Sequence, residues 1–236
     1  MASPEPYSFI PHPRTEPTIS GDTDIFVGVD REPVDMIPPW GIQLLRELYL
    51  HDKGSFEHSI RVGEVVHGAL REGVLEEPLE GISHEDLVLA GLLHDTGKVV
   101  LDPDLVINDT KVYTGEERER LKPHAAHGYS LIEPHNLLVA QLGGGHHLHQ
   151  KDSYGHEGAR NMGPAVVLGQ KLIATADVVD ALARKRSYHE PRGPEEIRGM
   201  MLSDGFLPSR FIDYCLAARF PLQRRSSGNT VFQARA

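Results

Sequence analysis

Apolar residues recur at helical spacing through most of the chain after Pro39. The segment Trp40–Tyr49 has this period, and Pro39 suits the first position of a helix. Ser83, followed by Glu85 and Asp86, is typical of a helix start ahead of an apolar run. No convincing alternation of apolar and polar residues follows residue 40. The sequence therefore predicts an all-α body without a substantial β-sheet.

The two ends of the chain differ from this body. Eight of the 17 prolines fall within the first 39 residues, and proline fixes φ and lacks a backbone N–H. We therefore expect residues 1–38 to form a Pro-rich, mostly irregular N-terminal extension. The domain itself is expected over residues 39–221, followed by a disordered tail over residues 222–236.

Charge and composition exclude several classes of protein. The formal charge of −10 argues against a protein that binds duplex nucleic acid through a broad basic face, but it leaves room for a small phosphorylated substrate. Cys215 is alone, so no disulfide framework can form within the chain. No apolar run reaches the roughly 18 residues of a membrane span, and the N-terminus lacks a secretory pattern. We expect a cytoplasmic protein with no membrane partner.

The 14 histidines carry the strongest chemical signal. An apolar helix ends in the pair His94-Asp95, and a buried carboxylate such as Asp177, within an apolar helix, needs a cation or a hydrogen-bond network. Imidazole and carboxylate groups are ligands of borderline divalent metals. Five histidines and two aspartates from separate helices could surround two metal ions: His58, His94, Asp95, His124, His146, His147 and Asp177.

In the order and spacing of these motifs, the sequence resembles the HD superfamily of metal-dependent phosphohydrolases, most closely its HD-GYP group. The resemblance extends from Ser55 to Phe220. It rests on these motifs: His58-Ser59-Ile60-Arg61-Val62, His94-Asp95-Thr96-Gly97-Lys98, Leu121-Lys122-Pro123-His124, His146-His147, Ala176-Asp177-Val178-Val179-Asp180-Ala181 and Arg186-Ser187-Tyr188.

The resemblance implies an HD-domain helical bundle with a dinuclear metal centre. One metal would be held by His58, His94, Asp95 and Asp177. Asp95 would bridge to a second metal held by His124, His146 and His147. Fe or Mn is the expected metal, with Zn, Ni or Mg as alternatives. Gly54 stands where some relatives place a glutamate for a third metal, so we expect two, although nearby Glu57 keeps a third open.

The resemblance also implies an activity. A hydroxide that bridges the two metals would attack a nucleotide-type phosphoester, with cyclic di-GMP as the best single substrate. Asp95 and Lys98 would be the catalytic residues, with Lys98 near the bridging water and the phosphate. Arg186 would help hold the substrate.

The loop after the histidine doublet departs from the HD-GYP pattern. Leu148 replaces the family glutamate, and Tyr154, Gly155 and His156 stand at the Gly-Tyr-Pro positions. Tyr154 is a candidate to bind the substrate by stacking on a base. The substrate is therefore less well defined by the sequence than the metal site.

Three other interpretations stay open. The chain could hydrolyse another nucleotide on the same scaffold, or use the same ligands in an HD-type di-iron oxygenase. It could also be a non-catalytic sensor of metal or nucleotide. Neither the oligomeric state, including a homo-oligomer, nor an input signal follows from the sequence.

Overall fold

The computed structural model describes residues 24–26, 28–75, 79–107, 113–184, 192–203, 209–220, 222–224 and 230–232. Its longer helices are α2 (Pro39–His51), α3 (Lys53–Arg71), α4 (His84–Leu93), α7 (His124–Ile132), α9 (Pro164–Ala183), α10 (Pro194–Ser203) and α11 (Ser209–Arg219). The shorter ones are η1 (Asp24–Phe26), α1 (Arg31–Asp35), η2 (Thr96–Val100), α5 (Pro103–Val106), α6 (Gly115–Leu121), α8 (Leu137–Gly143) and η3 (Glu157–Ala159). The predicted all-α body is confirmed.

Local capping explains where several helices begin. Pro39 occupies the first turn of α2, as the sequence predicts, and Pro164 occupies the first turn of α9. The Ser83 hydroxyl caps α4 by accepting a hydrogen bond from the Asp86 amide. The Asp52 carboxylate does the same for α3, accepting from the amides of Gly54 and Ser55. These caps place the start of α3, which carries His58, beside the end of α2.

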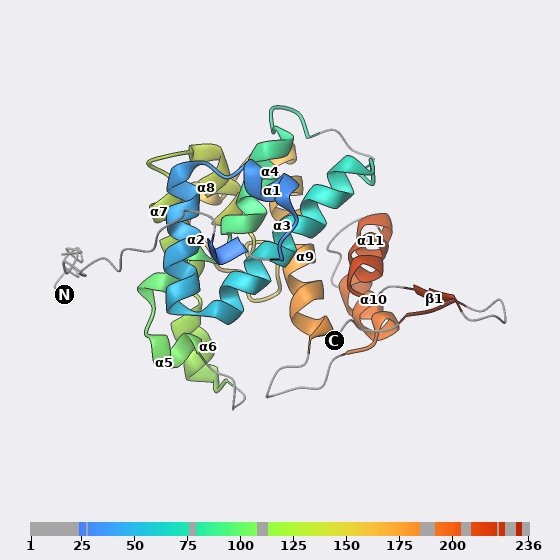
Figure 1. Cartoon of the computed structure of the whole chain (residues 1–236). Helices are drawn as coiled ribbons and strands as arrows, with labels where there is room; N and C mark the ends of the chain where they lie inside the picture. The colour runs from blue at the N-terminus through green and yellow to red at the C-terminus, as the bar shows by residue number, and fades with distance from the viewer. Residues whose placement is uncertain are drawn as a thin grey trace.

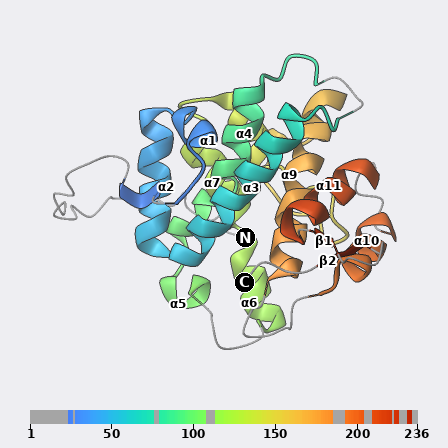
Figure 2. The ribbon, with the colours of Figure 1, turned by 45° about the vertical axis from the view of Figure 1, so that its right-hand side comes forward.

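The helices pack around α3, which lies against α4 on one side and α9 on another (Figure 1). Turning the molecule shows α11 beyond α9 and α10 beside α11 (Figure 2). Fully buried leucines and isoleucines of α2, α4, α7, α8 and α9 fill the space between the helices: Leu45, Leu48, Leu87, Leu92, Ile132, Leu142, Leu172 and Ile173.

Two helices of the bundle approach closely because glycines face each other. A Cβ on Gly63 of α3 would lie 2.4 Å from Leu92 Cδ2, and a Cβ on Gly91 of α4 would lie 3.5 Å from the Gly63 Cα. The small side chains let the backbones of α3 and α4 pack together. This contact brings His58, near the start of α3, close to His94, just after α4.

Short elements occur at both ends of the chain. Within the N-terminal segment, which was expected to be mostly irregular, the short helix α1 begins where the Asp30 side chain accepts a hydrogen bond from the Glu32 amide. Within residues 222–236, strands β1 (Leu222–Arg224) and β2 (Thr230–Phe232) pair as an antiparallel hairpin, where a disordered tail was predicted. In the described part of the chain, no helix has the length and apolarity needed to cross a bilayer.

Candidate metal centre

The seven predicted ligands come together in one buried cluster between α3, α4, α7, α9 and the turn after α8. Side-chain donor atoms fall into three overlapping groups, each within 4.8 Å: His58, His94 and Asp95; His124, His146 and His147; and His94, His146 and Asp177. The third group joins the other two, so the donors form one continuous site. The structure thus brings together all seven residues that the sequence proposes as ligands.

Asp95 lies at the centre of the cluster and is only 3% exposed. Its Oδ1 is 3.4 Å from His124 Nε2, and its Oδ2 is 3.6 Å from His94 Nε2 and 3.9 Å from His58 Nε2. Burial alone would raise the pKa of Asp95, but the charge of the Lys98 ammonium, above all, holds it well below its usual range. Asp95 is therefore a carboxylate with its two oxygens facing different imidazoles.

Three imidazoles are oriented by their own backbone. The Nδ1 atoms of His94, His124 and His146 lie 2.8, 2.7 and 2.5 Å from carbonyl oxygens three residues earlier. A carbonyl oxygen can only accept, so Nδ1 carries the proton and Nε2 keeps its lone pair. Second-sphere bonds of this kind are common for metal-ligating histidines.

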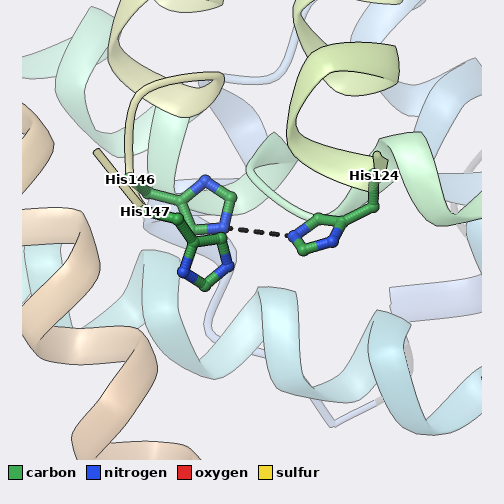
Figure 3. Close-up of side chains that lie close together, drawn as sticks. All are labelled: His124, His146 and His147. Carbon is green, nitrogen blue, oxygen red and sulfur yellow. Dashed lines mark hydrogen bonds between the residues drawn. The ribbon is translucent and has the colours of Figure 1, made fainter. Parts of the chain in front are cut away.

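The Nε2 atoms of these three imidazoles point into the cluster and carry no proton, so they cannot donate hydrogen bonds. Those of His124 and His146 face each other at 3.4 Å, and Figure 3 shows this contact with His147 alongside. Among the described residues, the buried His94 Nε2 has no hydrogen-bond partner. Two facing lone pairs and an orphaned buried nitrogen are unfavourable unless a cation lies among them. The donor set thus fits divalent metal ions, whose nitrogen and oxygen ligands lie about 3 Å apart when the bonds are about 2.1 Å.

His58 differs from the other imidazoles of the cluster. Its Nε2 is 2.9 Å from Asp177 Oδ1, and its Nδ1 is 2.7 Å from Asp180 Oδ2. Burial works to lower the pKa of His58, but the hydrogen bonds to these two carboxylates raise it overall. His58 and Asp177 face each other across the distance expected for two ligands of one ion.

Lys98 and Tyr154 border the cluster. Lys98 Nζ lies 2.5 Å from Asp95 Oδ2 and 3.2 Å from Ser55 Oγ, and its side chain is 20% exposed. The Tyr154 ring stacks on His147 with centroids 4.2 Å apart, and burial raises the pKa of its phenol. Both side chains therefore contact residues of the cluster directly.

Two other sequence expectations have different outcomes. Arg186 lies outside the described residues. Glu57, which kept a third metal open, is half exposed and pairs with Lys53 at 3.7 Å; it belongs to none of the metal-ligating groups found among the described residues.

The loop that departs from the HD-GYP pattern is held by side chains outside the cluster. His149 Nε2 bonds to Gln170 Oε1 at 2.8 Å, and the His156 ring stacks on Tyr129 with centroids 3.8 Å apart. Gln170, buried on α9, also donates to the carbonyls of Gln141 and Ala159. These contacts fix the loop that carries Tyr154.

Sequence reasoning gave no role to two residues behind the cluster. Asp180, 1% exposed, holds His58 and pairs with Arg61 and Arg219. Its position in an apolar helix, one turn after Asp177, was a usable signal. Arg219 offered none, because its pairing depends on how α11 packs.

The lowered pKa values of four buried imidazoles predict how the free energy of unfolding changes with pH once a chelator has removed the metal. Burial lowers the pKa of His124 to about 3 and lowers the pKa values of His94, His146 and His147. Below about pH 6.5 the unfolded chain binds protons that the folded chain does not. The free energy of unfolding should therefore fall as the pH falls, by up to about 1.4 kcal/mol per pH unit for each group.

His58 contributes to the pH dependence of the unfolding free energy in the opposite direction. Its raised pKa contributes stability that is fully present below about pH 6.5 and is lost as the pH rises through its folded pKa. Urea unfolding of chelator-treated protein at pH 7, 6 and 5 should show a falling midpoint. The variant His124→Asn should show a shallower dependence. A midpoint that is constant or rises toward pH 5 would contradict the assignment of four neutral imidazoles.

The family model described as HD domain matches residues 44–203. The cyclic di-GMP phosphodiesterase response regulator RpfG of Xanthomonas campestris pv. campestris is 30% identical over 153 residues, which cover 63% of this chain and 38% of RpfG. A cyclic di-GMP phosphodiesterase of Thermotoga maritima is 28% identical over 149 residues, 61% of this chain and 39% of that protein. The chain thus matches less than half the length of these relatives.

A third relative is the 3'3'-cGAMP-specific phosphodiesterase 2 of Vibrio cholerae, 28% identical over 117 residues that cover 48% of this chain and 22% of the relative. Among solved structures, the HD domain of the L. monocytogenes phosphodiesterase PgpH superposes with a TM-score of 0.51 at 14% identity, covering 73% of this chain and 92% of that domain. This likeness establishes a shared helical fold. Because the family model spans well over half of the sequence, the chain belongs to the HD domain family.

Proposed function

We propose that the chain is a metal-dependent phosphodiesterase that hydrolyses a cyclic dinucleotide at a dinuclear centre. The observation that carries the proposal is the buried cluster of imidazole Nε2 atoms and carboxylates around Asp95. Relatives named as cyclic di-GMP and 3'3'-cGAMP phosphodiesterases support the substrate class. So does the PgpH HD domain, which has also been solved in complex with cyclic-di-AMP.

The two ions would share Asp95. His58, His94, Asp95 and Asp177 would hold one, and His124, His146 and His147 would join Asp95 at the other, with Fe or Mn as the expected metals. When bound, the ions would supply Lewis-acid activation of water and of the phosphoryl group. The inward Nε2 atoms and the division of Asp95 between two groups of imidazoles support this assignment.

The side chains around the ions would position the substrate. The Lys98 ammonium, next to Asp95, would bind a phosphate oxygen and offset charge that develops there during the reaction. Tyr154, neutral because its pKa is raised, would present its ring face to a base while its other face lies on His147. Arg186 is proposed to contact the substrate on the strength of its sequence motif alone.

Product analysis tests the proposal. Protein reconstituted anaerobically with Fe(II) or Mn(II) is incubated with cyclic di-GMP, 3'3'-cGAMP and cyclic-di-AMP, and with a mononucleotide and a chromogenic phosphodiester for comparison. We expect a linear dinucleotide or a mononucleotide from at least one cyclic substrate, and no product after treatment with a chelator.

Other results would revise the proposal in distinct ways. Turnover of mononucleotides alone would indicate a different nucleotide phosphohydrolase. Substrate binding without product, at two bound ions per chain, would indicate a sensor. Oxygen consumption that depends on metal and substrate would indicate an oxygenase.

A further inference from the structure

A buried carboxylate behind the metal centre is shared by three cationic or imidazole groups. Asp180 Oδ2 is 2.7 Å from His58 Nδ1, and the Arg61 guanidinium approaches the same carboxylate with its Nε 3.0 Å from Oδ1 and its Nη2 3.0 Å from Oδ2. Arg219 Nη2 forms an ion pair with Oδ1, while Arg219 Nε and Nη2 make no hydrogen bond within the described part of the chain. The two guanidinium groups therefore pair with the negative charge of Asp180, and His58 Nδ1 is hydrogen-bonded to its Oδ2.

These groups come from three helices. His58 and Arg61 lie one turn apart on α3, Asp180 lies on α9, and Arg219 is the last residue of α11. Helix α11 is anchored by its buried face, which includes Phe211, Ile212, Cys215 and Leu216. Arg219 follows Cys215 by four residues, so it extends this face toward Asp180.

Arg219 lies beyond residues 44–203, the part of the chain that matches the HD domain. Its side chain is 17% exposed, and the Asp180 side chain that it contacts is 1% exposed. A guanidinium that is mostly buried loses much of its hydration, and an opposite charge beside it offsets that loss. Its partner here is the carboxylate that orients a proposed metal ligand.

We infer that Arg219 is a positioning residue for the metal centre: through Asp180 it fixes the His58 imidazole, so that helix α11 sets the affinity for one of the two ions. This inference rests on the proposed function, since it assumes that His58 binds metal. Without Arg219, Oδ1 of Asp180 would keep only Arg61. The carboxylate would then turn toward Arg61, and its bond to His58 Nδ1 would weaken.

The chain offers a matched control for this arginine. Arg198 on α10 pairs with Asp213 on α11 at 2.7 Å, but both side chains are well exposed, at 38% and 49%. Neither residue touches the metal cluster. Arg198→Gln thus removes an arginine–aspartate pair that involves α11 without altering Asp180.

The test measures Mn(II) binding to the full chain by competition with a chelating dye, with the stoichiometry determined for each variant. Circular dichroism verifies that each variant is folded. We expect Asp180→Asn to weaken one of the two Mn(II) sites by about 10- to 100-fold, the range seen when second-sphere partners of metal ligands are replaced. Arg219→Gln, one step further away, should weaken the same site by about 3- to 10-fold.

Two further variants separate positioning from general destabilisation. Arg219→Lys keeps the charge without the planar fork and should fall between wild type and Arg219→Gln. Arg198→Gln should bind both ions as the wild type does. This order of affinities, confined to one site, would support the inference.

The outcomes that overturn it are distinct. Wild-type protein that binds no Mn(II) would overturn the proposed function and this inference with it. Two intact sites in both Asp180→Asn and Arg219→Gln would overturn the inference alone. Weaker Mn(II) binding in Asp180→Asn but not in Arg219→Gln would show that α11 does not influence the site. Equally weakened binding in Arg198→Gln would show that the effect is nonspecific.

Discussion

Replacing Asp95 with alanine is expected to abolish binding of both metal ions together and to lower phosphodiesterase activity by at least about a thousandfold, since metal ions supply several kcal/mol of transition-state stabilisation. Asp95 is the proposed residue common to both ions, with one oxygen facing His124 and the other facing His94 and His58. Every other proposed ligand serves one ion. The joint loss of both is therefore a specific signature of Asp95.

The measurement is metal content and turnover of purified Asp95→Ala after reconstitution with Mn(II). Removing the carboxylate also leaves Lys98 without its 2.5 Å partner, so the fold should be verified by circular dichroism. Asp104→Ala, which changes an exposed carboxylate on α5, is the matched control and should retain both ions. Full activity in Asp95→Ala would refute the dinuclear assignment.

Gly97→Ala is expected to disrupt the same centre without touching any ligand. A Cβ at this position would lie 1.9 Å from the His124 carbonyl oxygen and 2.3 Å from the Gly128 amide nitrogen. Both are backbone atoms of α7, so no side chain can move aside to make room. The turn η2 must then separate from α7, and His124 must move away from Asp95.

Overpacking of this kind costs about 1–3 kcal/mol of unfolding free energy, and more where backbone cannot shift. We expect Gly97→Ala to lower the urea midpoint and to weaken metal binding at the His124 side by about tenfold or more. Gly199→Ala provides the comparison. A Cβ on this glycine of α10 would meet no atom of another described element within 4 Å, and alanine there should stabilise the helix by about 1 kcal/mol. An unchanged metal affinity in a stable Gly97→Ala protein would contradict the packing argument.

The helical body could be predicted from the sequence because its signals are local. The apolar period, the prolines at positions 39 and 164 and the Ser83 cap act within one or two turns of chain. The Pro-rich composition of residues 1–38 predicts a mostly irregular segment but does not locate the short helix α1, which begins at the Asp30 cap. The strand pair after Pro221 was missed because its short strands carry no clear alternation.

The cluster could be anticipated in membership but not in geometry. The motifs around His58, His94 and His124 identified residues that the fold brings together. The resemblance already implied that Asp95 would be shared between the two groups of ligands. The role of Asp180 could not be anticipated in the same way, because it depends on how α9 packs against α3. Arg219 shows the limit most clearly, because its partner lies 39 residues earlier and only the packing of α11 on α9 brings the two together.

The contact between His58 and Asp177 joins residues 119 positions apart in the chain. Closing so long a loop costs entropy before any contact across it can form, so this part of the site assembles only after α3 and α9 have docked. An ion that binds both residues would act like a cross-link on an already folded chain. Such a cross-link slows unfolding far more than it speeds folding, so the metal would protect this protein kinetically.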